Sequence, residues 1–254
     1  MRRLALVAAL VLLAGCRLDL DVGVNMAQDG SGTVTVTATA DAELLAKAPT
    51  AVQDLRLDDA RAAGWTVTGP TTTDTGGAQV VLTKPFGTPE QATAILAEIN
   101  GPNGPLRGLT LTQGREFAKV TTDLAGEVRL DGGLAAFADD ALVQVAGKVP
   151  LADQIAASGV PLDQALGLTL TVDVPGQVTA TTGTTADGAI TWAPPLVEGQ
   201  STPLQLTAVQ HDTAATRARD IERWTSWALV GWAVLFGVIV LAVLARAWHR
   251  RAPA

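Results

Sequence analysis

The chain has 254 residues and a formal net charge of −7, with 18 Lys and Arg against 25 Asp and Glu. This acidic balance disfavours nucleic-acid binding, which needs basic side chains to neutralise phosphates. A single cysteine excludes an intramolecular disulfide, so the fold has to be stabilised by its apolar core.

The first residues have the pattern of an export signal. Two arginines precede the apolar run 4–13, which is too short to span a bilayer as a helix. The LAGC stretch at 13–16 follows and resembles the lipobox of bacterial lipoproteins. The resemblance implies a signal peptide over 1–15 and a diacylglyceryl group on Cys16. The alternative is a buried free cysteine in an ordinary secreted protein.

A β-hairpin is expected directly after the cysteine. Apolar and polar residues alternate from Leu18 to Met26, which predicts a strand with one buried face. The DGSG stretch at 29–32 is a turn signal, and the alternating TVTVTATA at 33–40 predicts the return strand.

Helices and a second hairpin are expected next. A broken helix is predicted over 42–63. Two strands of a second hairpin follow at 65–68 and 78–83. The best-defined helix covers 88–100, because Thr88 suits the N-cap and Gln91 completes a capping box. The Asn-Gly pair at 100–101 ends it.

The second half of the chain is expected to be richer in strands. Strands are predicted at 108–113 and 116–130, and further β segments between 168 and 209. Core packing is the default role of Trp192. Between these strands lies an apolar stripe with helical spacing, which forms either core or the wall of an apolar pocket: Leu134, Phe137, Ala138, Ala141 and Leu142.

These elements together predict an α+β fold, an antiparallel sheet with about three helices on one side, plus one C-terminal transmembrane helix. The last β segments either complete the first sheet or form a subdomain. The expected organisation is a signal peptide (1–15), an extracytoplasmic domain (16–210), a juxtamembrane linker (211–223), a transmembrane helix (224–245) and a cytoplasmic basic tail (246–254).

The transmembrane prediction rests on the uncharged run 224–245. Its 22 residues are enough to cross a bilayer, and the arginines behind it favour the cytoplasmic side. The predicted localisation is therefore the cell membrane, with a lipid anchor at Cys16, a single pass at the C-terminus and the domain between them outside the cytoplasm.

Motifs for known chemistry are missing from the sequence. Residues 17–223 contain one histidine, His211, and three serines, none of them in a Gly-x-Ser-x-Gly setting. There is no Cys/His cluster for zinc, no phosphate loop and no dinucleotide fingerprint. We therefore predict a protein that is not an enzyme and that has no cofactor or metal site.

The layout resembles the LppM family of actinobacterial envelope lipoproteins. The resemblance implies an α+β extracytoplasmic domain without known catalytic residues, associated with envelope lipids and glycolipids. It is carried by the terminal apolar run and by these stretches: LLAGC (12–16), RLDLDVGVNM (17–26), DGSGTVTV (29–36), PGQV (175–178) and ITWAPP (190–195).

The functional prediction is a membrane-anchored envelope lipoprotein whose domain binds a lipid or glycolipid, acyl chain first, between its sheet and its helices. The alternative is a non-enzymatic envelope protein that acts through protein contacts, as a sensor or an assembly partner. The expected partners are thus membrane lipids or glycolipids, or envelope proteins.

Overall fold

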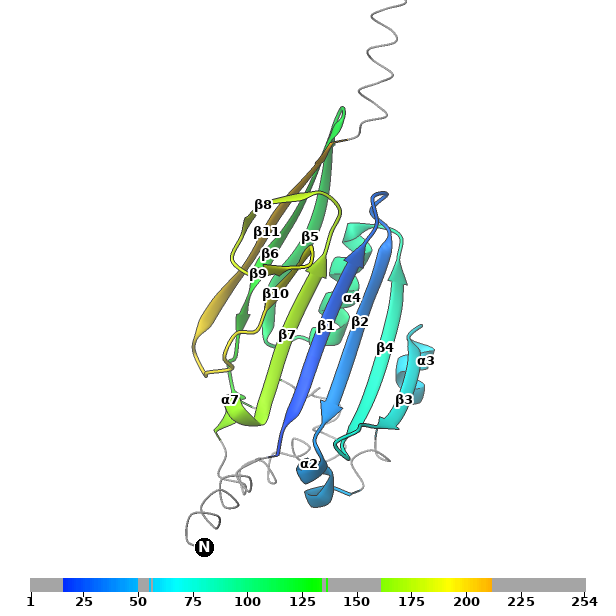
Figure 1. The fold of residues 1–254 in the computed structure, drawn as a ribbon, viewed down its shortest axis with the longest axis vertical. Helices are drawn as coiled ribbons and strands as arrows, with labels where there is room; N and C mark the ends of the chain where they lie inside the picture. The colour runs from blue at the N-terminus through cyan, green and yellow to red at the C-terminus, as the bar shows by residue number, and fades with distance from the viewer. Residues whose placement is uncertain (1–15, 50–54, 56, 134–135, 137–160, 212–254) are drawn as a thin grey trace, which may run out of the picture. The chain divides into compact units, whose positions relative to one another are not determined.

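The computed structural model describes residues 16–49, 55, 57–133, 136 and 161–211 (Figure 1). Within these residues the fold is mostly β, with eleven strands and four short helices. The larger sheet has seven strands, in the spatial order β3 (Thr66–Thr72), β4 (Ala78–Phe86), β2 (Gly32–Ala40), β1 (Leu18–Met26), β7 (Leu166–Asp173), β10 (Ala189–Trp192) and β9 (Thr184–Ala186).

The first hairpin is confirmed. β1 and β2 pair antiparallel, with Val22 opposite Val36 and Val24 opposite Val34. The Asp29 carboxylate accepts hydrogen bonds from the backbone N–H and the hydroxyl of Ser31 and so fixes the turn.

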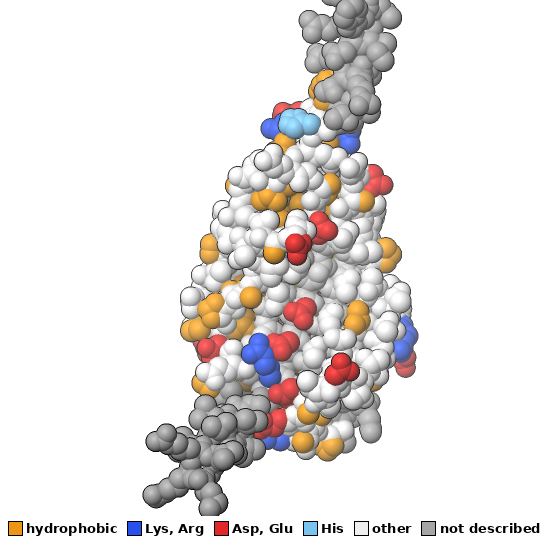
Figure 2. All heavy atoms as spheres, viewed as in Figure 1, with side chains coloured by type: hydrophobic (Ala, Val, Ile, Leu, Met, Phe, Trp, Pro, Cys, Tyr) orange, Lys and Arg blue, Asp and Glu red, His pale blue; other side chains and the backbone are white. Residues whose placement is uncertain are grey.

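The larger sheet has one apolar face, which we call the inner face. The cross-strand partners place its residues in rows, because opposed residues point to the same side of a sheet. In one row Leu20 of β1 lies opposite Ala38 of β2 and Leu168 of β7. The other face is lined by threonines and acidic residues, and Figure 2 shows it largely as uncharged polar surface with scattered acidic side chains.

A second, four-stranded sheet has the order β5 (Leu106–Glu116), β6 (Lys119–Arg129), β11 (Ser201–His211) and β8 (Gln177–Thr181). Its apolar residues, among them Leu111, Leu124 and Leu206, belong to the same buried core as those of the larger sheet. The late β segments therefore divide between the two sheets. Trp192 is buried as predicted, and its ring N–H donates to the Thr182 hydroxyl at 3.0 Å.

Helix α4 (Pro89–Asn100) packs on the inner face, and β1 and β2 pass in front of it in Figure 1. Its N-terminus is capped as the sequence predicts: the Thr88 hydroxyl accepts from the Gln91 N–H, and the Gln91 side chain accepts from the Gly87 N–H. Buried apolar residues on one side of the helix, including Ile95 and Leu96, join the core. The remaining helices are short: α2 (Ala42–Lys47), α3 (Leu57–Ala62) and α7 (Leu162–Ala165).

The predicted fold class, an antiparallel sheet with about three helices on one side and a transmembrane helix, is wrong. The described residues are mostly β and form two sheets, and β1 pairs with β7 in parallel, so the larger sheet is mixed. The helical patterns in the sequence predicted too much helix, because α2, α3 and α7 span at most 6 residues each. β7, which pairs with β1, and β11, which lies beside β6, have partners far away in sequence, and these pairings decide the architecture.

The predicted localisation through a single-pass C-terminal span is also corrected. Among the described residues, no helix is long and apolar enough to cross a membrane. The longest of these helices, α4, has 12 residues, whereas a span takes about 20. The run 224–245, the linker 211–223 beyond His211, the tail and the signal region 1–15 lie outside the described residues.

Candidate functional site

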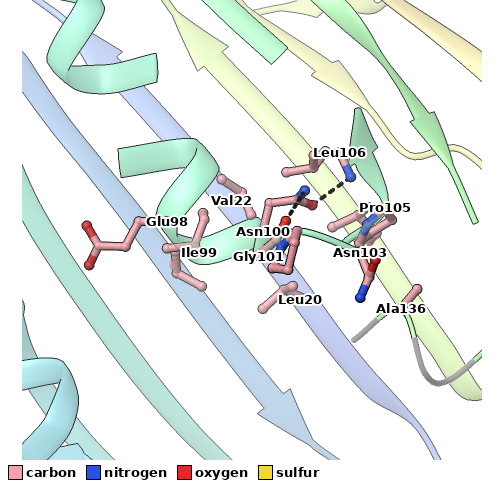
Figure 3. Close-up of a pocket in the computed structure, with 13 residues that line it drawn as sticks. Leu20, Val22, Glu98, Ile99, Asn100, Gly101, Asn103, Pro105, Leu106 and Ala136 are labelled. Atoms are coloured by element: carbon pink, nitrogen blue, oxygen red, sulfur yellow. Dashed lines mark hydrogen bonds between the residues drawn. The ribbon is translucent and has the colours of Figure 1, made fainter. Parts of the chain in front are cut away.

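A cavity of about 440 Å³ lies between the inner face of the larger sheet and the C-terminal end of α4 (Figure 3). Its residues come from β1, β2, β7, α4, the loop 101–105, the first residue of β5 and one residue after β6. They are Leu20, Val22, Val36, Glu98, Ile99, Asn100, Gly101, Pro102, Asn103, Pro105, Leu106, Ala136 and Leu168.

The floor of the cavity is apolar because of strand alternation. Leu20 and Val22 are successive inward residues of β1, and Val36 faces them from β2. Leu168 of β7 lies opposite Leu20. Val22 and Leu168 are buried, whereas Leu20 is only partly buried, so the floor loses its close packing toward Leu20.

The wall opposite the floor is formed by the end of α4 and the loop 101–105. The side chain of Asn100 closes this loop: its Oδ1 accepts from the Leu106 N–H at 2.7 Å, and its Nδ2 donates to the Gly101 carbonyl at 3.1 Å. Gly104 has to be glycine, because a Cβ there would collide with the backbone oxygen and the side chain of Asn100. The loop is therefore fixed by local hydrogen bonds and close packing.

Arg107 holds the outside of the same loop. Its Nη1 donates to the Pro102 carbonyl and its Nη2 to the Asn103 carbonyl, both at 3.1 Å. Asp131 lies 3.9 Å from Nη2 and completes the cluster. The guanidinium group therefore binds two backbone carbonyls of the loop 101–105 and keeps the rim in place.

A polar cluster attaches the end of α4 to the sheet. The carboxylate of Glu98 accepts from the Trp65 ring N–H at 3.0 Å and from the Lys84 ammonium at 2.7 Å. The same ammonium lies 5.4 Å from the centroid of the Trp65 ring. In Figure 3 the Glu98 carboxylate points away from the other lining side chains.

The pKa of the Glu98 carboxyl reflects two opposed effects. Partial burial raises it, but the hydrogen bonds from Lys84 and Trp65 and the charge of Lys84 together lower it below its ordinary value of 4.5. Glu98 is therefore ionised at neutral pH, and its charge is neutralised by Lys84 rather than offered to a ligand.

A second cavity, of about 250 Å³, lies farther along the same inner face. Leu18 and Ala38 contribute to it, one inward position beyond Leu20 and Val36 on the same strands. Its lining is entirely aliphatic and is drawn from β1, β2, α2, α3, β4 and Leu55: Leu18, Ala38, Ala40, Leu44, Leu45, Leu55, Leu57, Ala78, Val80 and Leu82.

The predicted pocket wall falls outside the described residues. This applies to Leu134, Phe137, Ala138, Ala141 and Leu142, and their role stays a prediction. Ala136, which lies within the same stretch, is described and lines the larger cavity. The cavity lies between sheet and helix, but its described walls come from other residues, and binding of an apolar ligand there stays a prediction.

Cys16 is buried at the start of the domain. The next residue is held in place, because the Arg17 N–H donates to the Asp41 carboxylate and the Asp41 N–H donates to the Arg17 carbonyl. The pKa of Lys47 is raised by its bond to Glu43 and, next, by the Cys16 thiol. Lipidation of Cys16 stays a prediction.

Sequence reasoning did not identify the loop 101–105 as a site. It used Asn100 and Gly101 as a helix stop, which the structure confirms, but nothing in the pattern showed that the Asn100 side chain builds a cavity wall. The proline and glycine content of this loop was the available signal. Within the described part of the chain, no group of His, Cys, Asp and Glu side chains could hold a metal ion.

Comparisons with known proteins add little. No protein-family model and no curated protein matches the chain. Among solved structures, the chain is similar to the NMR structure of the folded domain of LppM from Mycobacterium tuberculosis, with 15% identity and a TM-score of 0.41 over 79% of this chain and 94% of that one. This likeness does not show the lipobox or the C-terminal span, and it is too distant to transfer a function.

Proposed function

We propose that the protein binds the acyl chain of a lipid or glycolipid in the cavity on the inner face of the larger sheet. The observation that carries the proposal is the cavity itself, with its apolar floor at Leu20, Val22 and Leu168. Its volume of about 440 Å³ lies within the range of about 300–1,000 Å³ that is usual for ligand pockets.

The chemistry of the lining favours a hydrocarbon chain. About ten buried methylene groups supply roughly 8 kcal/mol of transfer free energy, before the cost of ordering the chain is subtracted. The aliphatic second cavity at Leu18 and Ala38 extends the same apolar surface along β1 and β2. A chain longer than the first cavity can therefore continue along this face.

The polar groups at the rim favour an uncharged headgroup. The Glu98 carboxylate is already paired with Lys84, and the Asn100 amide already holds the loop. The exposed side chain of Asn103 remains at the rim to meet a hydroxyl or sugar. An anionic headgroup is disfavoured by the negative charge of the chain.

The test is a fluorescence titration of the full-length protein with the uncharged methyl ester of dansylated undecanoic acid, whose emission increases and shifts to the blue in an apolar site. The key variant is Leu20→Trp, in which the indole ring fills the cavity floor. We expect it to weaken binding of the probe by about tenfold or more, because it replaces the volume that the chain would occupy.

The matched control is Asp21→Trp. It introduces the same ring on the same strand, one residue along, on the outer face. This control should bind the probe as the unmodified protein does. Equal loss in both variants, or equal binding by all three proteins, would contradict binding in the cavity and favour action through protein contacts instead.

A further inference from the structure

The second cavity lies over three small side chains of the inner face. Ala38 and Ala40 are successive inward residues of β2, and Ala78 of β4 lies opposite Ala40. In the neighbouring row of the same face, Val36 of β2 lies opposite Leu82 of β4, so larger side chains stand there. The three alanines leave space above the sheet, and the cavity of about 250 Å³ occupies it.

The roof of this cavity is formed in part by α2, which is fixed to the start of β1. Leu44 and Leu45 of α2 line the cavity, and Leu44 is buried. The Asp41 carboxylate caps α2, because it accepts from the Leu44 N–H at 2.7 Å, and it also accepts from the Arg17 N–H at 3.0 Å. The described floor and roof are therefore held together by hydrogen bonds.

The two cavities meet between opposed residues of β1 and β2. Leu20 lines the larger cavity, and Ala38, which lies directly opposite on β2, lines the second. No described residue lines both. Opposed residues have Cβ atoms about 5 Å apart. At this place the cavities are thus separated by the partly buried side chain of Leu20 and by the methyl group of Ala38.

The two cavities differ in polarity. The larger one has the exposed side chain of Asn103 at its rim, whereas every described side chain that lines the second is Ala, Val or Leu. An aliphatic cavity gives water no hydrogen-bond partners and accepts apolar ligands instead. A hydroxyl or sugar therefore finds partners at the larger cavity, and the second cavity suits the methyl end of a hydrocarbon chain.

From these features we propose that the protein selects acyl chains by length. The second cavity receives the end of a long chain whose first part lies in the larger cavity, and the small side chain of Ala38 lets the chain pass. This inference rests on the proposed function, because the chain has to enter the larger cavity first. Each methylene group that leaves water tightens binding by up to about fourfold. In the unmodified protein the affinity should therefore keep rising with chain length until the second cavity is filled.

The experiment measures how monoacylglycerols, from octanoyl to octadecanoyl, displace the dansylated ester from the full-length protein. Their glycerol headgroup is uncharged. All are supplied as complexes with cyclodextrin, so differences in solubility cancel when variants are compared. In Ala38→Leu the larger side chain stands where the cavities meet, and the affinity should stop rising at a shorter chain. The ratio of octadecanoyl to decanoyl affinity should fall by about tenfold or more.

Two further variants locate the effect. Ala78→Leu adds the same side chain one row farther from the larger cavity, and it should lower the same ratio by less. The matched control is Thr37→Leu, which introduces leucine on β2 next to Ala38 but on the outer face, and it should keep the length profile of the unmodified protein. Circular dichroism checks the folding of each variant, and Ala38→Val is the smaller substitution to use if leucine prevents folding.

An unchanged length profile in the folded variants of Ala38 and Ala78 would overturn this inference. So would tighter binding of dioctanoylglycerol than of the octadecanoyl compound if Ala38→Leu abolishes it, since the second cavity would then hold a second chain. The dansylated ester separates this inference from the proposed function. If Leu20→Trp weakens binding of the ester but the length profiles do not differ, this inference alone fails. If Leu20→Trp binds the ester as the unmodified protein does, both fail.

Discussion

The inner face of the larger sheet has two halves that are built from the same strands and packed differently. In the packed half, Val24, Met26, Val34 and Phe86 are buried in the core cluster to which α4 also contributes. In the cavity half, Leu18, Leu20, Ala38 and Ala40 lie on the same strands and face, but they are only partly buried and line cavities.

The difference lies in what covers the two halves, not in the strands. Both halves have the same alternation of apolar and polar residues, and cross-strand pairs continue through both in one register. Over the packed half, the side chains of α4, among them Ile95 and Leu96, fill the space. Beside the cavity half, α4 has ended at Asn100, and the loop 101–105 bounds the space without filling it. An ordinary strand pattern therefore produces core or cavity according to where the covering helix stops.

The largest expected effect is a difference in stability between two truncations on β1. Met26→Ala removes a buried side chain and should lower the free energy of unfolding by about 2–5 kcal/mol. Leu20→Ala enlarges a space that is already empty and should cost about 1 kcal/mol. Urea unfolding followed by circular dichroism measures both. Equal costs would show that the two halves are equally well packed.

Insertion of a large side chain should reveal the same contrast from the opposite direction. Val24→Trp overpacks the packed half and should destabilise the protein by about 3 kcal/mol. Leu20→Trp enters the cavity and should cost less than about 1 kcal/mol, while it blocks the acyl probe. Thermal unfolding gives the ranking, and a lower stability for Leu20→Trp than for Val24→Trp would argue against an accommodating cavity.

The wall of the cavity should respond to Gly104→Ala. The new Cβ collides with Asn100, so the hydrogen bond that closes the loop at Leu106 has to lengthen. We expect a loss of about 1–2 kcal/mol in unfolding free energy, together with weaker probe binding. The control is Gly114→Ala on β5, where a Cβ meets nothing within 4 Å and φ is not positive, and it should be neutral. If Gly104→Ala leaves the free energy of unfolding unchanged, the loop is not held as described.

The smallest effect concerns the attachment of α4 to the sheet. The pKa of Glu98 is lower in the folded chain than its ordinary value, so the carboxylate contributes stability above pH 4.5, which is lost as the pH falls through the folded pKa. Because the side chain is 40% exposed, the contribution should stay below about 1 kcal/mol. The stability difference between the unmodified protein and Glu98→Gln, measured by urea unfolding at several pH values, should shrink below pH 4.5. If the stability difference between the two proteins does not change with pH, ionised Glu98 does not make this contribution.

Local sequence signals predicted the first hairpin and α4 well. The turn at Asp29 and the cap at Thr88 are formed by side chains within three residues of the groups they bind, so the sequence alone contains the information. The pairing of β1 with β7 was not predictable in this way, because Leu18 and Leu166 are brought together by packing. The assignment of an antiparallel sheet failed at that pairing.

The predicted site residues lie outside the described part of the chain, so the site prediction stays untested. An apolar space between sheet and helix was expected, and the inward residues of β1 do form its floor. The side-chain bridge from Asn100 to Leu106 depends on the three-dimensional path of the loop, which alternation and helical spacing do not encode. Helical periodicity instead pointed to the stretch around Ala136, of which Ala136 is the described lining residue.

The most direct test of the central claim is a methyl NMR titration of the full-length protein with the uncharged methyl ester of dansylated undecanoic acid. The account predicts shifts at Leu20, Ile99 and Leu168, which line the larger cavity, and none at Val24 and Val34 in the packed half. Shifts spread evenly over both halves, or confined to methyl groups outside the cavity linings, would contradict binding of an acyl chain at this site.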